Sequence, residues 1–575
     1  MFSVKIRPNF IFFQTRNLHK YIYSMDKAYF REIKESDQFQ LTFQYTNSDL
    51  KVDRQFNFCR KLNESAQSLL TRVTTNVEKA VNKKNKKKKG APDDGQKLYV
   101  SLLLNNEPVE MDTICSEIFK PENEVTLNLI DRKYCVLINT PWVENIALPS
   151  SILSNFPVYL NKFEAMHTDQ DLSSFIWLKS KDKTNWTQVG EGFFYTPTNE
   201  DIGHYLKLQC TPKNQTKEGP MVETESTCIV EAGPGICQFE IRHAFTTNKL
   251  TGKEFRVVSY NILADLYCDS DYTRETLFPY CPPYALSIDY RKQLFRKEIT
   301  GYNADIICLQ EVDRKVYKND LHPIMTQLGY AGDFCVKGGE VVEGLTLFYN
   351  TARFNHLQSH RIVFAEILDK DPVLAEIWSK VAVNSKLSAR ILERTTTLQL
   401  NVIESIDNDE VLVVANTHLY FHPDSDHIRL IHGGVAIKYI ENFVEDLKKK
   451  TNKRISLIFC GDFNSTPECG IYKLYTTGHV PKNFIDYQSN KDEAIDNLEL
   501  QQPFKLASAC GTPKYTNFTA CFADCLDYIF YDRDNLSVVQ VVPLPSVEEL
   551  QQNTALPSVT FPSDHVALIA DLKFN

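Results

Sequence analysis

The sequence predicts a large α/β domain preceded by smaller β-rich domains, and three observations lead to this fold class. The chain has 575 residues, which is more than one hydrophobic core usually spans. From about residue 254 onward, near-continuous apolar segments such as "FRVVSYNIL", "ADIICLQEV" and "ISLIFCGDF" are separated by helical patterns. Strands of this kind are buried on both faces of a sheet. Before residue 254, alternating polar and apolar residues favour strands with one exposed face.

The composition limits the classes of function. Hydrophobic residues make up 43% and charged residues 24%, as in ordinary globular proteins. The net charge of −9 argues against binding long nucleic acids through bulk positive charge, but a small or single-stranded anion needs only a local cleft. Fifteen irregularly spaced cysteines indicate free thiols in a reducing compartment. No segment approaches the roughly 18 apolar residues of a membrane span, so we expect no membrane partner.

The first 25 residues have an unusual composition. They contain four lysines and arginines and no acidic residue, and aromatic and aliphatic residues lie between the cations. Mitochondrial presequences have this composition, whereas a secretory signal would need a longer apolar core without Arg16. A basic tail without a targeting role is the alternative. We therefore expect a targeting peptide over residues 1–25 and a location in the mitochondrial matrix.

Residues 26–136 are expected to form a small α+β domain of the β-grasp kind. The segments 39–45 and 54–62 alternate like two strands of a hairpin, and 63–81 has apolar residues at helical spacing. Six lysines follow within residues 83–89. Such a block repels itself and predicts a loop, with contact to RNA or phosphate as the less favoured interpretation.

Residues 137–231 are expected to form a β-sandwich-like domain. Trp177 lies in the middle of a predicted strand, and Asp201, Gly203 and Tyr205 resemble the tyrosine-corner pattern of immunoglobulin-like sandwiches. Any other small β-sandwich would have a similar role in packing or substrate positioning. Residues 231–236, "EAGPGI", are typical of a linker, and the large domain covers 254–575.

Polar residues end several apolar strands of the large domain, where sites are usually built on a rigid sheet. Taken singly, each has an ordinary explanation, such as an asparagine that caps a turn. Asp527 is harder to explain, because it precedes the apolar run 528–530 and a buried carboxylate needs a partner. His565 is the natural candidate. The full set is Asn261, Gln310, Glu311, Asp313, Asn416, His418, Asp462, Asn464, Asp527, Asp564 and His565.

Six motifs occur in a fixed order: SYNIL, LQEVD, THL, GDFNSTP, LDYIF and SDH. Together they resemble the DNase-I-like endonuclease/exonuclease/phosphatase superfamily over about residues 255–574. The motifs SYNILAD and YTNFT are similar to its deadenylase branch, which includes nocturnin and the Angel proteins. The resemblance implies a DNase-I-like four-layer α/β sandwich. It also implies a phosphodiesterase and 3′-exoribonuclease that acts on 2′,5′-oligoadenylate and on poly(A) RNA and releases AMP.

The resemblance also implies a metal site. Mg²⁺ is the expected ion, with Mn²⁺ as the alternative, because carboxylate and amide oxygens suit a hard cation. Glu311 corresponds to the principal ligand, and Asn261 lies beside it. Asp462 is a further candidate ligand, Asn464 would lie near a second ion, and Asp564 would either ligate or shape its loop.

The catalytic roles carried over from the family are as follows. Asp462 would orient or deprotonate the attacking water, and Asn464 would hold a phosphate oxygen. His418 would donate a hydrogen bond to a non-bridging oxygen. His565, oriented by Asp527, would bind the phosphate as negative charge builds up.

Adenine preference calls for flat side chains. Phe518 and Pro423 match the positions that sandwich the base in the family. The cytoplasmic deadenylases have an acidic residue before that proline, and His422 stands here instead, which puts the base contact in doubt. Arg429 could bind a backbone phosphate or lie on a helix surface.

Three alternatives remain open. A zinc site would use histidines whose spacing fits no tight tetrahedral motif. A nocturnin-like phosphatase acting on a nucleotide cofactor would share the catalytic residues. A non-catalytic RNA-binding scaffold would not need them. We expect a monomer that binds oligoadenylate and poly(A) RNA. The zinc candidates are His418, His422, His427 and His432.

Overall fold

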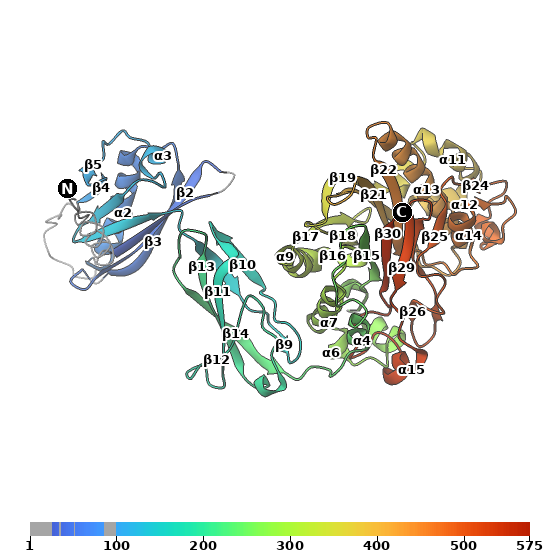
Figure 1. Cartoon of the computed structure of the whole chain (residues 1–575), viewed down its shortest axis with the longest axis horizontal. Helices are drawn as coiled ribbons and strands as arrows, with labels where there is room; N and C mark the ends of the chain where they lie inside the picture. The colour runs from blue at the N-terminus through green and yellow to red at the C-terminus, as the bar shows by residue number, and fades with distance from the viewer. Residues whose placement is uncertain (1–25, 34–35, 51, 86–98, 269) are drawn as a thin grey trace, which may run out of the picture. The chain divides into compact units, whose positions relative to one another are not determined.

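The computed structural model describes residues 26–33, 36–50, 52–85, 99–268 and 270–575 (Figure 1). The proposed targeting peptide and most of the lysine-rich run lie outside the described residues. The chain divides into two compact units. Unit 1 comprises residues 1–148, 162–195 and 205–226, and unit 2 comprises 149–161, 196–204 and 227–575. The boundary between the two units therefore falls within residues 137–231, for which the sequence predicts a single domain.

Unit 1 contains a seven-stranded sheet in the order β3-β2-β1-β7-β6-β4-β5. Strands β2 and β3 pair antiparallel over their whole length, which confirms the predicted hairpin. The helix α2 (Ala66–Asn85) follows, and Leu69, Val73 and Val77 are buried in the core of this unit. The strands are β1 (Asp26–Glu32), β2 (Gln38–Asn47), β3 (Val52–Lys61), β4 (Val100–Leu104), β5 (Glu107–Pro108), β6 (Val125–Leu129) and β7 (Arg132–Ile138).

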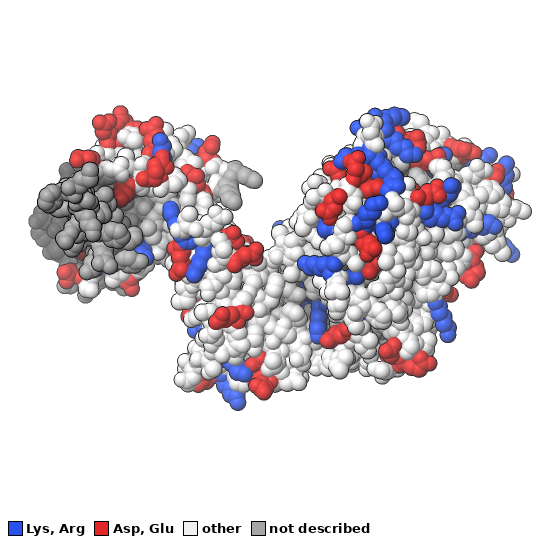
Figure 2. Space-filling view, viewed as in Figure 1, with Lys and Arg blue, Asp and Glu red and all other residues white. Residues whose placement is uncertain are grey.

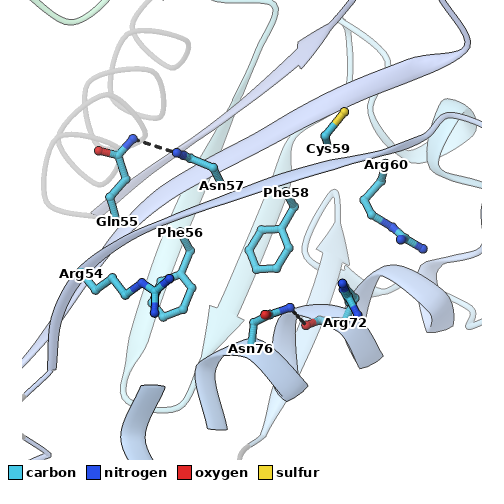
Figure 3. A pocket seen from close by; sticks show the side chains of 9 residues that line it. All are labelled: Arg54, Gln55, Phe56, Asn57, Phe58, Cys59, Arg60, Arg72 and Asn76. Carbon is cyan, nitrogen blue, oxygen red and sulfur yellow. Dashed lines mark hydrogen bonds between the residues drawn. The ribbon is translucent and has the colours of Figure 1, made fainter. Parts of the chain in front are cut away.

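The strand β3 lies at one edge of this sheet. A hollow of about 210 Å³ is lined by residues of β3 and α2, and in Figure 3 Phe56 and Phe58 point toward the helix that carries Arg72. Arg54 lies over the Phe56 ring, and Arg60 pairs with a neighbouring glutamate. Charged side chains at a sheet edge oppose pairing with a second chain. This role accounts for Arg54 and Arg60, which lie on β3.

The β-rich segment of unit 1 contains β8 (Trp142–Ala147), β10 (Lys162–Met166), β11 (Asp169–Ser180), β12 (Thr187–Glu191) and β13 (Tyr205–Lys213). β11 pairs antiparallel with both β12 and β13. Trp177 lies on β11, is fully buried, and donates from Nε1 to the carbonyl of Gly192 at 2.9 Å. The tryptophan predicted in mid-strand is thus part of the core.

Unit 2 is built on two six-stranded sheets, and its alternating side chains form three apolar layers. Val257 and Cys308 belong to the layer shared by both sheets, and their neighbours Val258 and Ile307 face the opposite way. The outward residues of the first sheet pack on α7 (Ile288–Gly301) and α9 (His322–Gln327), and those of the second on α13 (Asp426–Lys448) and α14 (Gly470–Thr477). This arrangement is the predicted four-layer α/β sandwich.

The first sheet has the order β17-β18-β16-β15-β30-β29 and the second the order β19-β20-β21-β22-β28-β25. The strands of the first are β15 (Glu254–Asn261), β16 (Ile306–Asp313), β17 (Tyr330–Val336), β18 (Glu343–Asn350), β29 (Leu536–Val541) and β30 (Leu568–Phe574). Those of the second are β19 (Phe354–Val363), β20 (Thr397–Ser405), β21 (Glu410–His418), β22 (Arg454–Asp462), β25 (Leu506–Ser508) and β28 (Asp527–Asp532).

The surface and the cysteines agree with the composition. On the face drawn in Figure 2, acidic and basic side chains are interspersed over unit 2. All fifteen cysteines are free thiols. Among the described residues, no helix has the length and apolar character that crossing a membrane requires.

Candidate active site

Three ionisable side chains lie in one row across the second sheet. β21 and β22 are parallel, and their last residues, His418 and Asp462, are register partners. β28 runs antiparallel to β22 and begins with Asp527, which pairs with Asp462. Because partners in register point to the same face of a sheet, these side chains meet at one edge.

The first sheet contributes an amide and a carboxylate to the same place. Asn261 ends β15, and Glu311 lies at an irregularity of the β16–β18 pairing, with a left-handed φ of +54°. Such a bulge re-aims a side chain, and non-glycine residues adopt this backbone conformation rarely. Asn261 Nδ2 donates to Glu311 Oε1 at 2.9 Å and to Asp462 Oδ2 at 3.0 Å, so one amide connects the two sheets.

The carboxylates of this site carry more negative charge than the neighbouring cations balance. Burial, with Asp564 and Glu343 nearby, raises the pKa of Glu311 to about 7. Burial and Asp527 raise the pKa of Asp462 to about 6. Both acids are therefore close to taking up protons at neutral pH, and a bound cation would satisfy them instead.

The predicted pair of Asp527 and His565 is present. His565 Nδ1 lies 2.7 Å from Asp527 Oδ2, which also accepts from Thr516 Oγ1 at 2.6 Å. Burial works against a charged ring, but Asp527, Asp462 and Asp564 outweigh it and raise the pKa of His565 well above its usual value. The ring is therefore an imidazolium, and its Nε2 lies 3.5 Å from Asp462 Oδ2.

His418 is held in the opposite protonation state. Burial, Lys337 and His565 lower its pKa well below the usual value, so the ring is neutral. Lys337 Nζ lies 3.2 Å from His418 Nδ1, and an ammonium can only donate, so the ring proton lies on Nε2. That atom is 3.6 Å from Asp462 Oδ2 and 4.0 Å from Glu311 Oε1. Sequence reasoning missed Lys337, because its segment "CVKGG" carries no recognisable motif.

Asn464 and Asp564 complete the predicted set. Asn464 has a φ of +48°, and its backbone N–H donates to Asp462 Oδ1 at 2.9 Å, so the turn after β22 holds both side chains together. Its own amide donates to the Leu419 carbonyl at 2.9 Å. Asp564 Oδ2 accepts from Asn517 Nδ2 at 3.2 Å.

Most of these residues, though not Asn261 or Asp527, line a cleft of about 1020 Å³. A volume at the upper end of the roughly 300–1000 Å³ usual for ligand sites can take more than one nucleotide unit. The predicted site residues that line the cleft are Glu311, His418, Pro423, Arg429, Asp462, Asn464, Asp564 and His565, and Lys337 lines it too.

Phe518 does not line this cleft, but it lines a second hollow next to it together with Phe522. Its side chain is only 6% exposed and packs in a cluster with Tyr515 and Leu550. Phe522, four residues later, is 46% exposed and lines the cleft. The strands β26 (Asn517–Phe518) and β27 (Ala523–Asp524) form a short hairpin. Phe518 is the last residue of β26, and Phe522 is the turn residue directly before β27. The only sequence signal was a second phenylalanine just after the YTNFT motif.

Arg429 lies on α13, lines the cleft and contacts the loop that precedes this helix. Its guanidinium donates to the carbonyls of Tyr420 at 2.9 Å and His422 at 2.7 Å and pairs with Asp426. The Arg429 side chain is only 4% exposed. Through these contacts it holds the loop that carries Pro423. The His422 ring turns to Asp424 and does not line the cleft.

The donor set fits a hard divalent cation. Asp462, Asp527 and His565 offer ligand atoms within 4.8 Å of one another, but His565 Nδ1 and Asp527 are already bonded to each other. The oxygens of Glu311, Asp462 and Asp564, which line the cleft, are the better set for such an ion; Asn261 Oδ1 accepts from the Leu263 N–H at 3.0 Å. The zinc alternative receives no support, because His427 bonds to Glu493 and His432 is buried beside Phe364. The contacts of His427 and His432 therefore do not bring the histidines together around one metal position.

The chain is similar to known proteins over nearly its whole length. A profile described as the Endonuclease/Exonuclease/phosphatase family matches residues 258–565, and one described as the 2′,5′-phosphodiesterase 12-like N-terminal domain matches 140–231. The 2′,5′-phosphodiesterase 12 of Mus musculus is 38% identical over 596 aligned positions, which cover 97% of this chain and 96% of that protein. The Homo sapiens protein of that name is 39% identical over 591 positions, covering 96% and 95%. The solved structure of ANGEL2, described as a 2′,3′-cyclic phosphatase, has 22% identity and a TM-score of 0.46 and covers 57% of this chain and 97% of its own.

The first profile covers more than half of the chain, and the relatives cover nearly all of it. The family depends on divalent metal ions, in agreement with the oxygen donors around Glu311. Its phosphodiesterase members indicate a hydrolase. The chain therefore belongs to the endonuclease/exonuclease/phosphatase family, and within it to the group of the 2′,5′-phosphodiesterase 12 proteins.

Proposed function

We propose that the chain is a Mg²⁺-dependent phosphodiesterase and 3′-exoribonuclease that hydrolyses 2′,5′-oligoadenylate and the poly(A) tails of mitochondrial RNA. The observation that carries this proposal is the cleft in which a neutral histidine, an imidazolium and uncompensated carboxylates converge. The names of the most similar relatives support the linkage class. The basic, acid-free first 25 residues support the mitochondrial matrix.

Glu311 and Asn261 would hold the principal ion, with Asp462, Asn464 and Asp564 next to it. A divalent ion at this place would withdraw charge from the phosphate and lower the pKa of water. Mg²⁺ is favoured because the donors are oxygens, and Mn²⁺ is the alternative.

The chain's own residues supply the remaining chemistry. Asp462 accepts a proton from the attacking water, whose oxygen forms the new bond to phosphorus. The bond to the ribose oxygen of the preceding nucleotide breaks, and AMP leaves with the phosphate. The ribose oxygen takes up a proton from the solvent as Asp462 gives its own proton up. His418 Nε2–H and the His565 imidazolium donate hydrogen bonds to phosphate oxygens, and Asn464 adds an amide. Asp527 fixes the orientation and charge of His565.

Phe522 and Pro423 would hold the terminal adenine. Both line the cleft, and Phe522 replaces Phe518 in this role. Stacking contributes about 1–3 kcal/mol per base and suits a purine. We expect a monomer that takes oligoadenylate and poly(A) RNA as its partners.

The test is AMP release from a 2′,5′-linked triadenylate and its 3′,5′ isomer, each with Mg²⁺ and with a chelator. Cleavage of both isomers that requires Mg²⁺ and is lost in Glu311→Ala supports the proposal. Cleavage of the 3′,5′ isomer alone would make the protein a plain deadenylase. Inactivity on both would favour the phosphatase acting on a nucleotide cofactor.

A further inference from the structure

A second hollow adjoins the active-site cleft. It has a volume of about 540 Å³ and shares Thr519, Cys521 and Phe522 with the cleft. Phe522 therefore forms part of the partition between the two spaces. The volume falls within the roughly 300–1000 Å³ of small-molecule sites, so the hollow is large enough for a nucleotide.

The partition is held in place by its own hairpin. The Thr519 backbone N–H donates to the Phe522 carbonyl at 2.7 Å, and the Thr519 hydroxyl accepts from the Phe522 N–H at 3.1 Å. The base of the hairpin is tied to the active site, because the Phe518 N–H donates to the Asp564 carbonyl at 2.9 Å. An aromatic ring presented this way can offer stacking surface to both spaces.

The charge of the second hollow differs from that of the cleft. None of its described lining residues is acidic, and Lys514 is basic, whereas the cleft is lined by six carboxylates. Lys514 forms no ion pair with any described residue. Hydrogen bonds from the Glu548 backbone N–H and from Ser546 lower the pKa of Glu548, and the nearby Lys514 adds a smaller effect. Glu548 and Glu549 lie near Tyr515 at the border of the hollow, so Lys514 is the residue of the hollow that can bind a phosphate group.

Gln551 supplies an amide at the same place. It lines the hollow at the start of the short helix Gln551–Asn553, and its side chain has no hydrogen-bond partner among the described residues. A glutamine amide can pair with the N6 and N7 atoms of adenine, one as acceptor and one as donor. An aromatic wall, a free amide and a free ammonium are together what an adenylate needs.

We propose that this second hollow is a subsite for the adenylate that precedes the terminal nucleotide of the substrate. The proposal rests on the proposed function, which puts the terminal adenine on the other side of Phe522. Gln551 recognises the base of the preceding nucleotide, Phe522 stacks on it, and Lys514 binds its 5′-phosphate. The enzyme would thereby read two consecutive adenines instead of one.

The test uses dinucleotides that end in the same adenylate and carry adenosine, uridine or an abasic riboside before it. With the full chain, kcat/KM should be about tenfold higher for adenosine than for the other two, as one stacked and hydrogen-bonded base implies. Gln551→Ala should reduce the preference for adenosine over uridine to less than threefold. Lys514→Gln should remove the gain in kcat/KM from a 5′-phosphate on the first nucleotide.

Gln501→Ala and Lys449→Gln serve as matched controls, because both residues lie outside the two spaces and should leave every ratio unchanged. The dissociation constants of the dinucleotides, measured with a chelator, give the same comparison without turnover. Wild-type protein that binds and cleaves all three dinucleotides within twofold overturns the subsite. Protein that binds the adenosine form more tightly but releases no AMP overturns the proposed function and keeps the subsite.

Discussion

His432 makes the stability of unit 2 dependent on pH in a way that can be calculated. It lies on α13, is fully buried, and neither of its ring nitrogens has a hydrogen-bond partner in the described part of the chain. Burial, with a smaller contribution from Arg394, lowers its pKa to about 3. The folded protein therefore holds this ring neutral, while the unfolded chain protonates it at about pH 6.5.

The direction of the effect follows from these two pKa values. Above pH 6.5 the ring is neutral in both states and has no influence on the pH dependence. As the pH falls below 6.5, the unfolded state binds a proton that the folded state does not bind, so stability is lost. At pH 5 the loss is about 2 kcal/mol, because each pH unit below 6.5 corresponds to about 1.4 kcal/mol.

His432→Phe removes the titrating group and keeps an aromatic ring beside Phe364, whose centroid lies 5.1 Å from that of His432. Urea unfolding of wild type and variant at pH 7.5 and pH 5.0 measures the effect, with Trp378 reporting on unit 2. The contributions of the other histidines cancel when the two pH differences are subtracted. We expect the variant to lose about 2 kcal/mol less than wild type on acidification. Equal losses in both proteins would refute the reasoning.

Three further predictions concern the active site. Asp527→Asn removes the charge that keeps His565 protonated and should lower kcat by about 10²–10⁴-fold with little change in KM, measured by steady-state AMP release; an unchanged kcat contradicts the assigned role. Lys337→Met frees the His418 ring to take the other tautomer and should reduce kcat about tenfold. The tautomer is measured from the ¹⁵N chemical shifts of the ring, and a ring that keeps its proton on Nε2 would contradict this account. Mg²⁺ at about 100 times its dissociation constant should stabilise the metal-free protein by about 2.7 kcal/mol, which is measured as a rise in Tm. Glu311→Gln should abolish this rise. A variant whose Tm rises as much as that of wild type would exclude Glu311 as a ligand.

Much of the fold and of the site could be predicted from the sequence. Apolar strands with polar residues at their ends indicate buried sheets and a site at one edge, because strand ends are held rigidly in register. Asp527 is the clearest case. A carboxylate at the start of an apolar strand requires a partner, and the structure puts His565 Nδ1 2.7 Å away. Local pattern and elementary electrostatics were sufficient for this pair.

Only the tertiary structure decided which side chains face the cleft from its loops. Phe518 and Phe522 have the same chemistry, but Phe518 packs against Leu550, far away in the chain, and Phe522 is left at the surface. Lys337 sets the proton of His418 across 81 residues of sequence. Loop side chains are oriented by contacts between distant segments, which no local periodicity encodes.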